Sequence, residues 1–332
     1  MNRSTSPRRF APIALLAIVS MALLVAACGP LTGDLGGVAT PPPSEQPSLD
    51  VPSSEPTPGS SEGPTTAPDA TPSEPTGGTP TPTPAPAGTI TVRAYFFLGS
   101  FVDNAGLVPV LREIPKTQAV GAAAMGALLE GPNDAELGAR PAMYTAIPEG
   151  TRFLGLRIDG GIATVNLSRE FESGGGSASV LGRLAQVVYT LTQFPTVSGV
   201  KFELDGVPVT VFSGEGVVLT DPVDRSDYTD QLPTVFVDRP AWGGVIGNPA
   251  RLVGMANVFE ATFHVKILDG GGRSLANGPV MATCGTGCWG TFDVTIPYNV
   301  GSAGWGTLQV YELSAADGSV INLTEYPVWL TP

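Results

Sequence analysis

The hydrophobic pattern between Ser177 and Asp205 predicts a helix that is followed directly by a strand. Apolar side chains recur at spacings of three and four, whereas Arg183, Gln186 and Gln193 fall outside this stripe. The stripe ends just before a proline, and the residue before a proline disfavours helical angles. Apolar and polar residues then alternate as in a half-buried strand. We therefore expect a helix packed on a sheet.

The same pattern analysis predicts an α+β domain over residues 89–228. Two β-branched and aromatic strands are followed by a helix, rich in alanine and glycine, from about Thr117. A hairpin joined by Asp159, Gly160 and Gly161 comes next, then the helix described above and two short strands. This order predicts a mixed or antiparallel sheet with two helices on one face.

Residues 232–332 contain only short strand patterns, separated by glycine, asparagine and proline. Seven such strands in about 100 residues predict an all-β immunoglobulin-like sandwich. The charged segment Asp221–Gln231 is predicted to be a short linker between the two domains. The expected strands are Val235–Val237, Arg251–Met255, Phe259–Leu268, Val280–Cys284, Gly290–Ile296, Gly306–Leu313 and Val320–Trp329.

Residues 1–28 have the pattern of a bacterial lipoprotein signal peptide. Three arginines precede a 17-residue apolar run that ends in small residues before Cys28. The run is shorter than the roughly 20 residues that span a bilayer comfortably. Small residues before a cysteine resemble a lipobox, in which the cysteine is lipidated and becomes the mature N-terminus. An uncleaved anchor, or an ordinary signal peptide with a chance cysteine, are the alternatives.

Residues 29–88 are rich in proline, threonine, serine and glycine and contain no lysine, arginine or aromatic residue. So little apolar surface cannot offset the entropy of ordering, so we predict a disordered tether. The chain carries a net charge of −13, of which the tether contributes −7 and the signal peptide +3, leaving −9 on residues 89–332. Nucleic acid is therefore not an expected partner, because binding it normally requires a basic patch.

Several short motifs occur in a fixed order within residues 89–228. They are Leu128-Leu129-Glu130-Gly131-Pro132, Ile147-Pro148-Glu149-Gly150-Thr151, Ile158-Asp159-Gly160 with Val165-Asn166-Leu167-Ser168, Gln186-Val187-Val188-Tyr189-Thr190-Leu191 and Phe212-Ser213-Gly214-Glu215-Gly216. The ordered set resembles the GerMN domain of spore-germination lipoproteins. This resemblance implies an α/β module related to the ring-building motifs of sporulation and secretion assemblies, with no known catalytic activity. Asn166 stands where the family often has aspartate, which argues against a chemical role for this position.

A second set of motifs runs through residues 232–332. They are Asp238-Arg239-Pro240, Val253-Gly254-Met255-Ala256-Asn257 with Phe259-Glu260, Leu268-Asp269-Gly270, Gly290-Thr291-Phe292 and Tyr311-Glu312-Leu313-Ser314 with Asp317-Gly318. They resemble the immunoglobulin-like domain that accompanies GerMN in bacterial lipoproteins. The resemblance supports the predicted fold more than any function, because sandwiches have many roles.

The glycine-rich loop before the predicted helix is the candidate ligand or partner contact. Gly174, Gly175, Gly176 and Ser177 place free backbone amides at a helix N-terminus, where an anion can bind. The loop lacks the lysine and the spacing of a P-loop. The alternative is a loop that only lets the chain turn into the helix.

Glu170 and Glu172 are interpreted as solvated acids and not as a catalytic pair.

Cys284 and Cys288 are predicted to form a disulfide that clamps a loop, whereas a metal site with His264 is disfavoured. Three tryptophans, Trp242, Trp289 and Trp305, form either an exposed strip for sugar or peptide or a cap on the sandwich core.

The leading hypothesis is a non-catalytic lipoprotein, anchored on the extracytoplasmic face of the cell membrane, that scaffolds or binds envelope proteins. By resemblance it acts in sporulation or germination. With 3 lysines against 14 arginines, the composition indicates a high-GC organism that need not form spores. For such bacteria the resemblance implies a link to envelope signalling. A binding module for peptidoglycan or a small anionic ligand is the alternative, and self-association is expected under the scaffold hypothesis.

A cell-wall enzyme is the least favoured hypothesis. Residues 89–228 contain neither histidine nor cysteine, and no GxSxG or HExxH motif occurs in the chain. We therefore assign no catalytic residue, metal ligand or cofactor.

Overall fold

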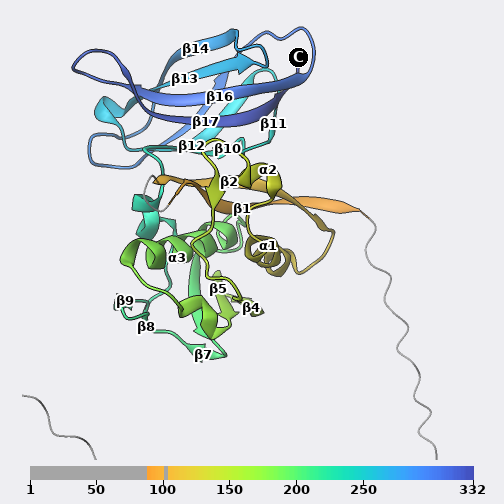
Figure 1. Cartoon of the computed structure of the whole chain (residues 1–332), viewed down its shortest axis with the longest axis vertical. Coiled ribbons are helices and arrows are strands. Elements are labelled where there is room, and N and C mark those ends of the chain that lie inside the picture. Colours follow the sequence, from red (N-terminus) through yellow and green to blue (C-terminus); the bar gives the residue numbers. More distant parts are fainter. Residues whose placement is uncertain (1–87, 101–103) are drawn as a thin grey trace, which may run out of the picture. The chain divides into compact units, whose positions relative to one another are not determined.

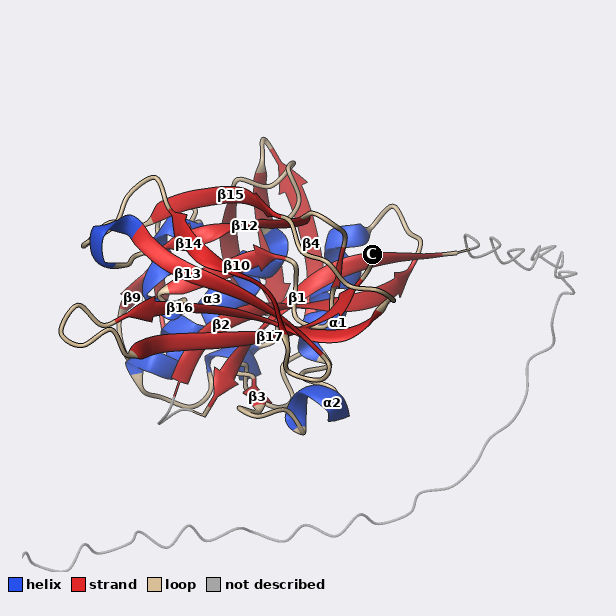
Figure 2. Ribbon diagram, turned by 90° about the horizontal axis from the view of Figure 1, so that it is seen from above, coloured by secondary structure: helices blue, strands red, loops and turns tan. Residues whose placement is uncertain are grey.

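The computed structural model describes residues 88–100 and 104–332 (Figure 1). The predicted signal peptide, Cys28 and all of the predicted tether except Gly88 lie outside the described residues. Within the described part, no helix combines the length and the apolar character needed to cross a bilayer. Strands predominate over helices throughout, as Figure 2 shows.

The first sheet is antiparallel and is built on a long hairpin. Strands β1 (Thr89–Gly99) and β2 (Asn104–Pro115) pair along their whole lengths, and the short β3 (Met143–Tyr144) pairs with the end of β1. The β-branched and aromatic residues of β1 favour this extended conformation. Residues 94–98 of β1 are buried on both faces, so this strand lies in the interior of the folded chain.

The second sheet is mixed, which is one of the two sheet types that the sequence predicted. Its order is β4 (Phe153–Asp159), β5 (Ile162–Leu167), β6 (Gly199–Leu204) and β7 (Val207–Pro208). Only β5 and β6 are parallel, because helix α3 (Ser177–Leu191) makes the crossover that parallel strands require. A separate ribbon of β8 (Val211–Phe212) and β9 (Val217–Val218) follows.

The helices lie between these two sheets, as Figure 1 shows for α1 (Val120–Leu129) and α3. Helix α3 contacts β1 on one side and β6 on the other, whereas α1 contacts β1 and β4. The first strand pair thus forms its own sheet on the far side of the helix layer from the mixed sheet. Because α3 is enclosed from two sides, Arg183 and Gln186, expected outside its buried stripe, are buried as well.

The remaining strands form the predicted two-sheet sandwich. One sheet has the order β10-β12-β15 and the other β11-β17-β16-β13-β14. Alternating residues of β13, Phe263, Val265 and Ile267, point into the core between the sheets. The strands are β10 (Val235–Arg239), β11 (Val245–Ile246), β12 (Ala250–Ala256), β13 (Thr262–Asp269), β14 (Ser274–Met281), β15 (Gly290–Ile296), β16 (Gly304–Leu313) and β17 (Val320–Leu330).

Two further sequence-based predictions differ from the structure. The segment Asp221–Gln231 is not a simple linker, because two short 3-10 turns between Arg225 and Gln231 bury Tyr228. The predicted strand Val280–Cys284 is β14, which begins six residues earlier and includes Asn277, Gly278 and Pro279. These residues are typical of turns, so the sequence pattern does not predict a strand there. The strand forms nevertheless, because β14 lies at the edge of its sheet, where proline is tolerated.

Candidate functional site

The N-terminus of α3 is the candidate site, and it is reached through the loop Ser173–Ser177. Gly174 and Gly176 have φ angles of +73° and +93°, which other residues adopt rarely, so glycine is what lets the chain turn into the helix here. The Ncap residue is Gly176, which has no side chain to cap the helix. The first-turn amides therefore depend on partners from elsewhere in the chain.

A glutamate from a distant ribbon supplies that partner. The amide of Gly176 and the hydroxyl of Ser177 donate to the two carboxylate oxygens of Glu215, at 3.2 Å and 2.8 Å. A negative charge at a helix N-terminus is stabilising, so Glu215 occupies the position at which an external anion would bind. The ligand contact at Gly174, Gly175, Gly176 and Ser177 stays a prediction, and any anion there competes with Glu215.

The buried side chain of Arg183 is hydrogen-bonded to the backbone at the start of the same loop. One guanidinium nitrogen donates to the carbonyls of Phe171 and Ser173, both at 2.7 Å, and another donates to the Ser179 hydroxyl at 2.8 Å. Arg183 is only 1% exposed, and its hydrogen bonds within the described residues go to backbone carbonyls and a serine hydroxyl. Its burial lowers the pKa of the guanidinium. Backbone carbonyls thus compensate a desolvated charge, and the loop is fixed in return.

Two glutamines complete the open edge of β1: Gln186 lies in α3, and Gln193 follows its C-terminus. The Gln193 side chain accepts from the Arg93 amide at 2.8 Å and donates to the Arg93 carbonyl at 2.7 Å. Gln186 donates to the Tyr95 carbonyl at 2.8 Å and accepts from the Ala146 amide at 2.7 Å. These side chains replace the neighbouring strand where β3 no longer pairs, which satisfies buried backbone groups and blocks the edge. We call Arg183, Gln186 and Gln193 the α3 seam.

The acidic residues before the loop do not form a catalytic pair. The exposed Glu170 lies 3.9 Å from Arg152, whereas Glu172 accepts from the Ser213 amide at 2.9 Å. Hydrogen bonding from the Ser168 side chain lowers the pKa of Glu170, opposite to the shift a general acid needs. Asn166 likewise has a structural role, because its side-chain oxygen accepts from the Gly206 amide at 2.9 Å.

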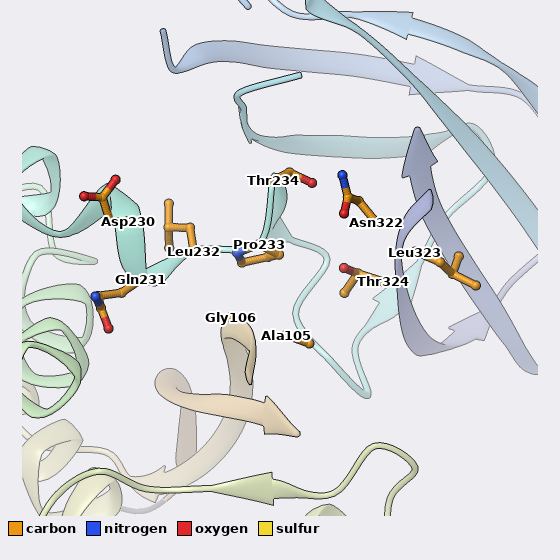
Figure 3. Close-up of a pocket in the computed structure, with 10 residues that line it drawn as sticks. All are labelled: Ala105, Gly106, Asp230, Gln231, Leu232, Pro233, Thr234, Asn322, Leu323 and Thr324. Atoms are coloured by element: carbon orange, nitrogen blue, oxygen red, sulfur yellow. The ribbon is translucent and has the colours of Figure 1, made fainter. Parts of the chain in front are cut away.

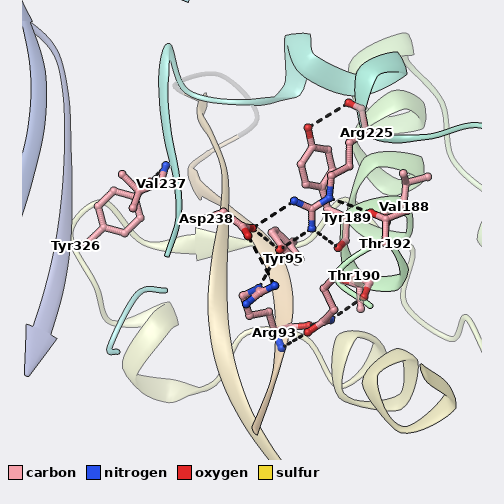
Figure 4. Close-up of polar contacts among 11 residues, drawn as sticks. Arg93, Tyr95, Val188, Tyr189, Thr190, Thr192, Arg225, Val237, Asp238 and Tyr326 are labelled. Carbon is pink, nitrogen blue, oxygen red and sulfur yellow. Dashed lines mark hydrogen bonds and ion pairs between the residues drawn. The ribbon is translucent and has the colours of Figure 1, made fainter. Parts of the chain in front are cut away.

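A polar cluster that the sequence analysis missed joins the α/β domain to the sandwich (Figure 4). The Tyr95 hydroxyl donates to Asp238 of β10 at 2.6 Å, and it accepts from Arg93 at 3.1 Å and from Arg225 at 3.0 Å. Arg93 and Arg225 also approach the Asp238 carboxylate, at 3.6 Å and 3.4 Å. The Arg225 guanidinium lies 4.7 Å from the centre of the Tyr189 ring.

This cluster unites four segments that are far apart in the sequence. Burial, followed by the charge of Asp238, raises the pKa of Tyr95 to about 12, so its hydroxyl stays protonated as the donor to Asp238. Arg225 comes from the segment that the charge pattern marked as a linker. No spacing rule identifies such a cluster, because its members meet only when the domains pack together.

A cavity of about 310 Å³ lies beside this junction (Figure 3). Gly106 of β2 lies against Pro233 so closely that a Cβ there would clash with the proline nitrogen. The other polar groups that line the cavity are Asp230, Gln231, Thr234, Asn322 and Thr324. This lining contains one carboxylate and no cation, so it does not fit the small anionic ligand considered from the sequence.

The structure joins Cys284 and Cys288 in a disulfide, with their Cα atoms 5.9 Å apart. His264 does not approach them as a ligand; its ring stacks on Tyr311, with centroids 5.5 Å apart. In the part of the chain that the structure describes, no group of three or more potential metal-binding side chains occurs.

The three tryptophans do not form one strip. Trp242 and Trp289 are partly buried against the core, whereas Trp305 is 56% exposed. The amide of Trp242 donates to the Pro109 carbonyl of β2 at 2.9 Å, which places it at the junction of the two domains. Trp305 instead pairs edge-to-face with Trp329, with ring centroids 5.4 Å apart.

Comparison with protein families identifies both domains. Residues 93–210 match the Germane family of sporulation and spore germination, and residues 234–319 match Gmad2, the immunoglobulin-like domain of bacterial spore germination. Both resemblances drawn from the sequence motifs are therefore confirmed. A search among curated proteins finds no match for the chain.

Several solved structures are similar to parts of the chain. The first GerMN domain of the sporulation protein GerM from Bacillus subtilis is 20% identical over 42% of this chain and 100% of that structure, with a TM-score of 0.35. The tandem GerMN domains of the same protein are 16% identical over 63% of this chain and 62% of that one, with a TM-score of 0.35. A candidate lipoprotein from Clostridium perfringens is 21% identical over 46% and 98%, with a TM-score of 0.30.

Proposed function

The chain combines a Germane domain with a Gmad2 immunoglobulin-like domain, and from this premise we propose that it is a non-catalytic, membrane-anchored envelope lipoprotein that scaffolds or binds other envelope proteins. The observation that carries the proposal is the pairing of these two sporulation and spore-germination modules in one chain. The host process is sporulation or germination, or envelope signalling where the host does not form spores.

The contacts around α3 support a structural role for this element. The α3 seam is bonded to backbone groups, and Glu215 caps the helix N-terminus. These groups fix the shape of the domain and are not assembled around a reacting centre. The cluster of Tyr95 and Asp238 fastens the domain to the sandwich, which favours a two-domain unit that presents surfaces.

The sequence of the first 88 residues supports the anchor. The small residues before Cys28 match a lipobox, and the following 60 residues have the composition of a flexible spacer. Such a spacer would reach roughly 40 Å as a flexible coil and up to about 190 Å as extended polyproline II. The folded unit would then act at a distance from the membrane surface.

Processing and fractionation test the anchor. We expect globomycin to block maturation of the wild-type chain, and Cys28→Ala to release the protein from the membrane fraction. A wild-type protein found entirely in the soluble fraction would overturn the anchor but leave the interaction role to be tested separately.

Crosslinking in the native host tests the interaction role. We expect the wild-type chain to form discrete crosslinked complexes with envelope proteins, identified by mass spectrometry. Light scattering on the purified protein separates self-association from complexes with other proteins. The absence of any specific complex, together with peptidoglycan turnover that a single carboxylate substitution abolishes, would establish an enzyme instead.

Peptidoglycan binding is the second candidate function, and the exposed Trp305 beside Trp329 favours it. Aromatic faces are common platforms for sugar rings, and Trp305 is the member of the tryptophan set that stays exposed. A pull-down with isolated sacculi distinguishes the two functions. Binding that Trp305→Ala abolishes supports the peptidoglycan function, whereas unchanged binding rules out this platform.

A further inference from the structure

The end of the sandwich at which β16 ends and β17 begins lies opposite the C-terminus and carries exposed apolar side chains. Phe259 lies on the 3-10 turn before β13, and its amide donates to the Glu312 carboxylate at 3.3 Å. That carboxylate also accepts from the Asn322 side chain at 2.7 Å, which joins the turn to the β16–β17 hairpin. We call this surface the loop end. Its apolar residues are Phe259, Met281, Leu313, Val320, Ile321 and Leu323, between 42% and 71% exposed.

Backbone strain is concentrated at the loop end. Six residues other than glycine have positive φ angles in the described chain, and four of them build this surface: Glu260, Ala261, Thr286 and Asn322. Two of the four are consecutive and directly follow Phe259. Such conformations are strained in residues other than glycine and tend to cluster at functional sites such as ligand clamps.

A network around the disulfide loop holds this strained turn in place. The Thr286 hydroxyl accepts from the Glu260 amide at 2.9 Å, and the Thr286 amide donates to the Val258 carbonyl at 2.8 Å. Thr286 lies within the loop that Cys284 and Cys288 close. Phe259 is thus presented on a rigid support, which reduces the entropy that binding would cost.

The charge at the loop end has one sign only. The segments that build it, residues 257–262, 281–290 and 311–323, contain Glu260, Glu312 and Asp317 and no lysine, arginine or histidine. Hydrogen bonds from the Ser319 amide and hydroxyl lower the pKa of Asp317, which keeps it ionised at neutral pH. A surface of exposed apolar side chains with acidic neighbours complements an apolar segment that carries basic residues.

We propose that the loop end is a docking surface for an apolar segment of another protein that is flanked by lysine or arginine. This inference rests on the proposed role as an interaction module and names the surface and the chemistry of the partner. An anionic bilayer would be repelled by Glu260 and Asp317. A second copy docking through the same surface would bring like charges together.

The test uses the mature chain, residues 28–332, with Cys28→Ser in place of the lipid anchor. The probe is a fluorescein-labelled amphipathic peptide of leucine and lysine, and the matched control peptide has glutamate in place of lysine. We expect fluorescence anisotropy to show binding of the lysine peptide at least about tenfold tighter than binding of the glutamate peptide.

Two kinds of variant localise the binding. Phe259→Ser with Ile321→Ser removes apolar anchors, and Glu260→Gln with Asp317→Asn removes charge but keeps the apolar surface. Each pair should weaken binding at least about tenfold, as loss of anchor residues does at other interfaces. The charge pair serves as the deciding variant if the serine pair fails to fold.

The matched control removes exposed valines of similar exposure elsewhere. Val211→Ser with Val218→Ser acts on the β8–β9 ribbon, where these side chains are 56% and 65% exposed. Equal loss of binding in this control would overturn the proposal, because the probe would then recognise any exposed apolar residue. Binding to vesicles of phosphatidylglycerol, or dimers in sedimentation velocity that Phe259→Ser with Ile321→Ser abolishes, would also overturn it in favour of a membrane or a second copy.

Crosslinking in the host separates this proposal from the proposed function. If the Phe259→Ser and Ile321→Ser chain recovers the same partners as wild type, the interaction role stands and the loop end is not the surface. If wild type recovers no partner, the interaction role itself fails. Loss of the partners in this variant but not in the Val211→Ser and Val218→Ser control supports both.

Discussion

The α3 seam and the loop end contain unusual residues of opposite kinds. At the α3 seam, polar side chains are buried or partly buried, and every one of them is bonded to the backbone of another segment. At the loop end, apolar side chains are exposed on a strained backbone. Burying a polar group lowers the stability of the fold unless the group is hydrogen-bonded. Exposed apolar groups contribute little to the fold and are available to a partner. Variants of the first region should therefore change stability, and variants of the second should change binding.

The largest loss of stability is expected at Arg183. Arg183→Met keeps the volume but leaves the carbonyls of Phe171 and Ser173 without their donor, so the free energy of unfolding should fall by about 3 kcal/mol or more. Urea denaturation followed by circular dichroism measures it. The control Arg251→Met removes an exposed ion pair with Asp293 and should cost less than about 1 kcal/mol. Equal losses in the two variants would contradict the role of the α3 seam.

The two glutamines should differ from each other. Gln186→Leu leaves the Tyr95 carbonyl and the Ala146 amide unpaired in the interior and should cost about 2–3 kcal/mol. Gln193 is only partly buried, so water can replace it in Gln193→Leu, and the loss should be about 1 kcal/mol. Hydrogen exchange at the Ala146 and Arg93 amides, measured by NMR, gives a second readout. Unchanged protection in both variants would show that the glutamines do not complete the edge of β1.

The disulfide tests how much the rigid support matters at the loop end. Replacing Cys284 and Cys288 by serine should lower the free energy of unfolding by about 2 kcal/mol, because only a short loop is released in the unfolded chain. The same variant should also weaken binding of the lysine peptide. Stability that falls without any change in binding would separate the disulfide from the proposed surface.

The buried tyrosine should make the junction sensitive to alkaline pH. Tyr95 has its pKa raised to about 12 in the folded chain, so its contribution to stability is complete below pH 10 and is lost as the pH rises through about 12. Tyr95→Phe should therefore reduce the slope of unfolding free energy against pH in this range by up to about 1.4 kcal/mol per pH unit. Denaturation series at several alkaline pH values measure the slope. An identical slope in the variant would show that Tyr95 ionises freely.

The smallest effect is expected at Glu215. Glu215→Gln removes the charge at the exposed N-terminus of α3 and should cost at most about 1 kcal/mol. The variant also opens the predicted anion contact at Gly176 and Ser177 to direct measurement. Titration with inorganic phosphate, followed through the Gly176 amide resonance, should show tighter binding in Glu215→Gln than in wild type. Equal affinity would mean that Glu215 does not occupy that position.

Local sequence patterns were sufficient for the elements that have regular periodicity. The apolar stripe of α3, the Asp159-Gly160-Gly161 hairpin and most sandwich strands occur where the sequence predicted them. Strand β14 was placed too late because Asn277, Gly278 and Pro279 break the alternation, and an edge strand tolerates them. The charge of the segment before the sandwich predicts a linker, because charged residues usually lie in solvent, but in the structure Arg225 is held by Tyr95 and Asp238.

The sequence by itself determined the order of the modules, the family resemblance of both domains and the glycine turn into α3. These depend on neighbouring residues, whose spacing and backbone preferences act locally. Only the tertiary structure decided that Glu215 fills the helix N-terminus, that two glutamines replace a strand and that strained residues gather at one end of the sandwich. Those features join residues that are distant along the chain, and they arise when the sheets enclose α3 and the two domains pack together.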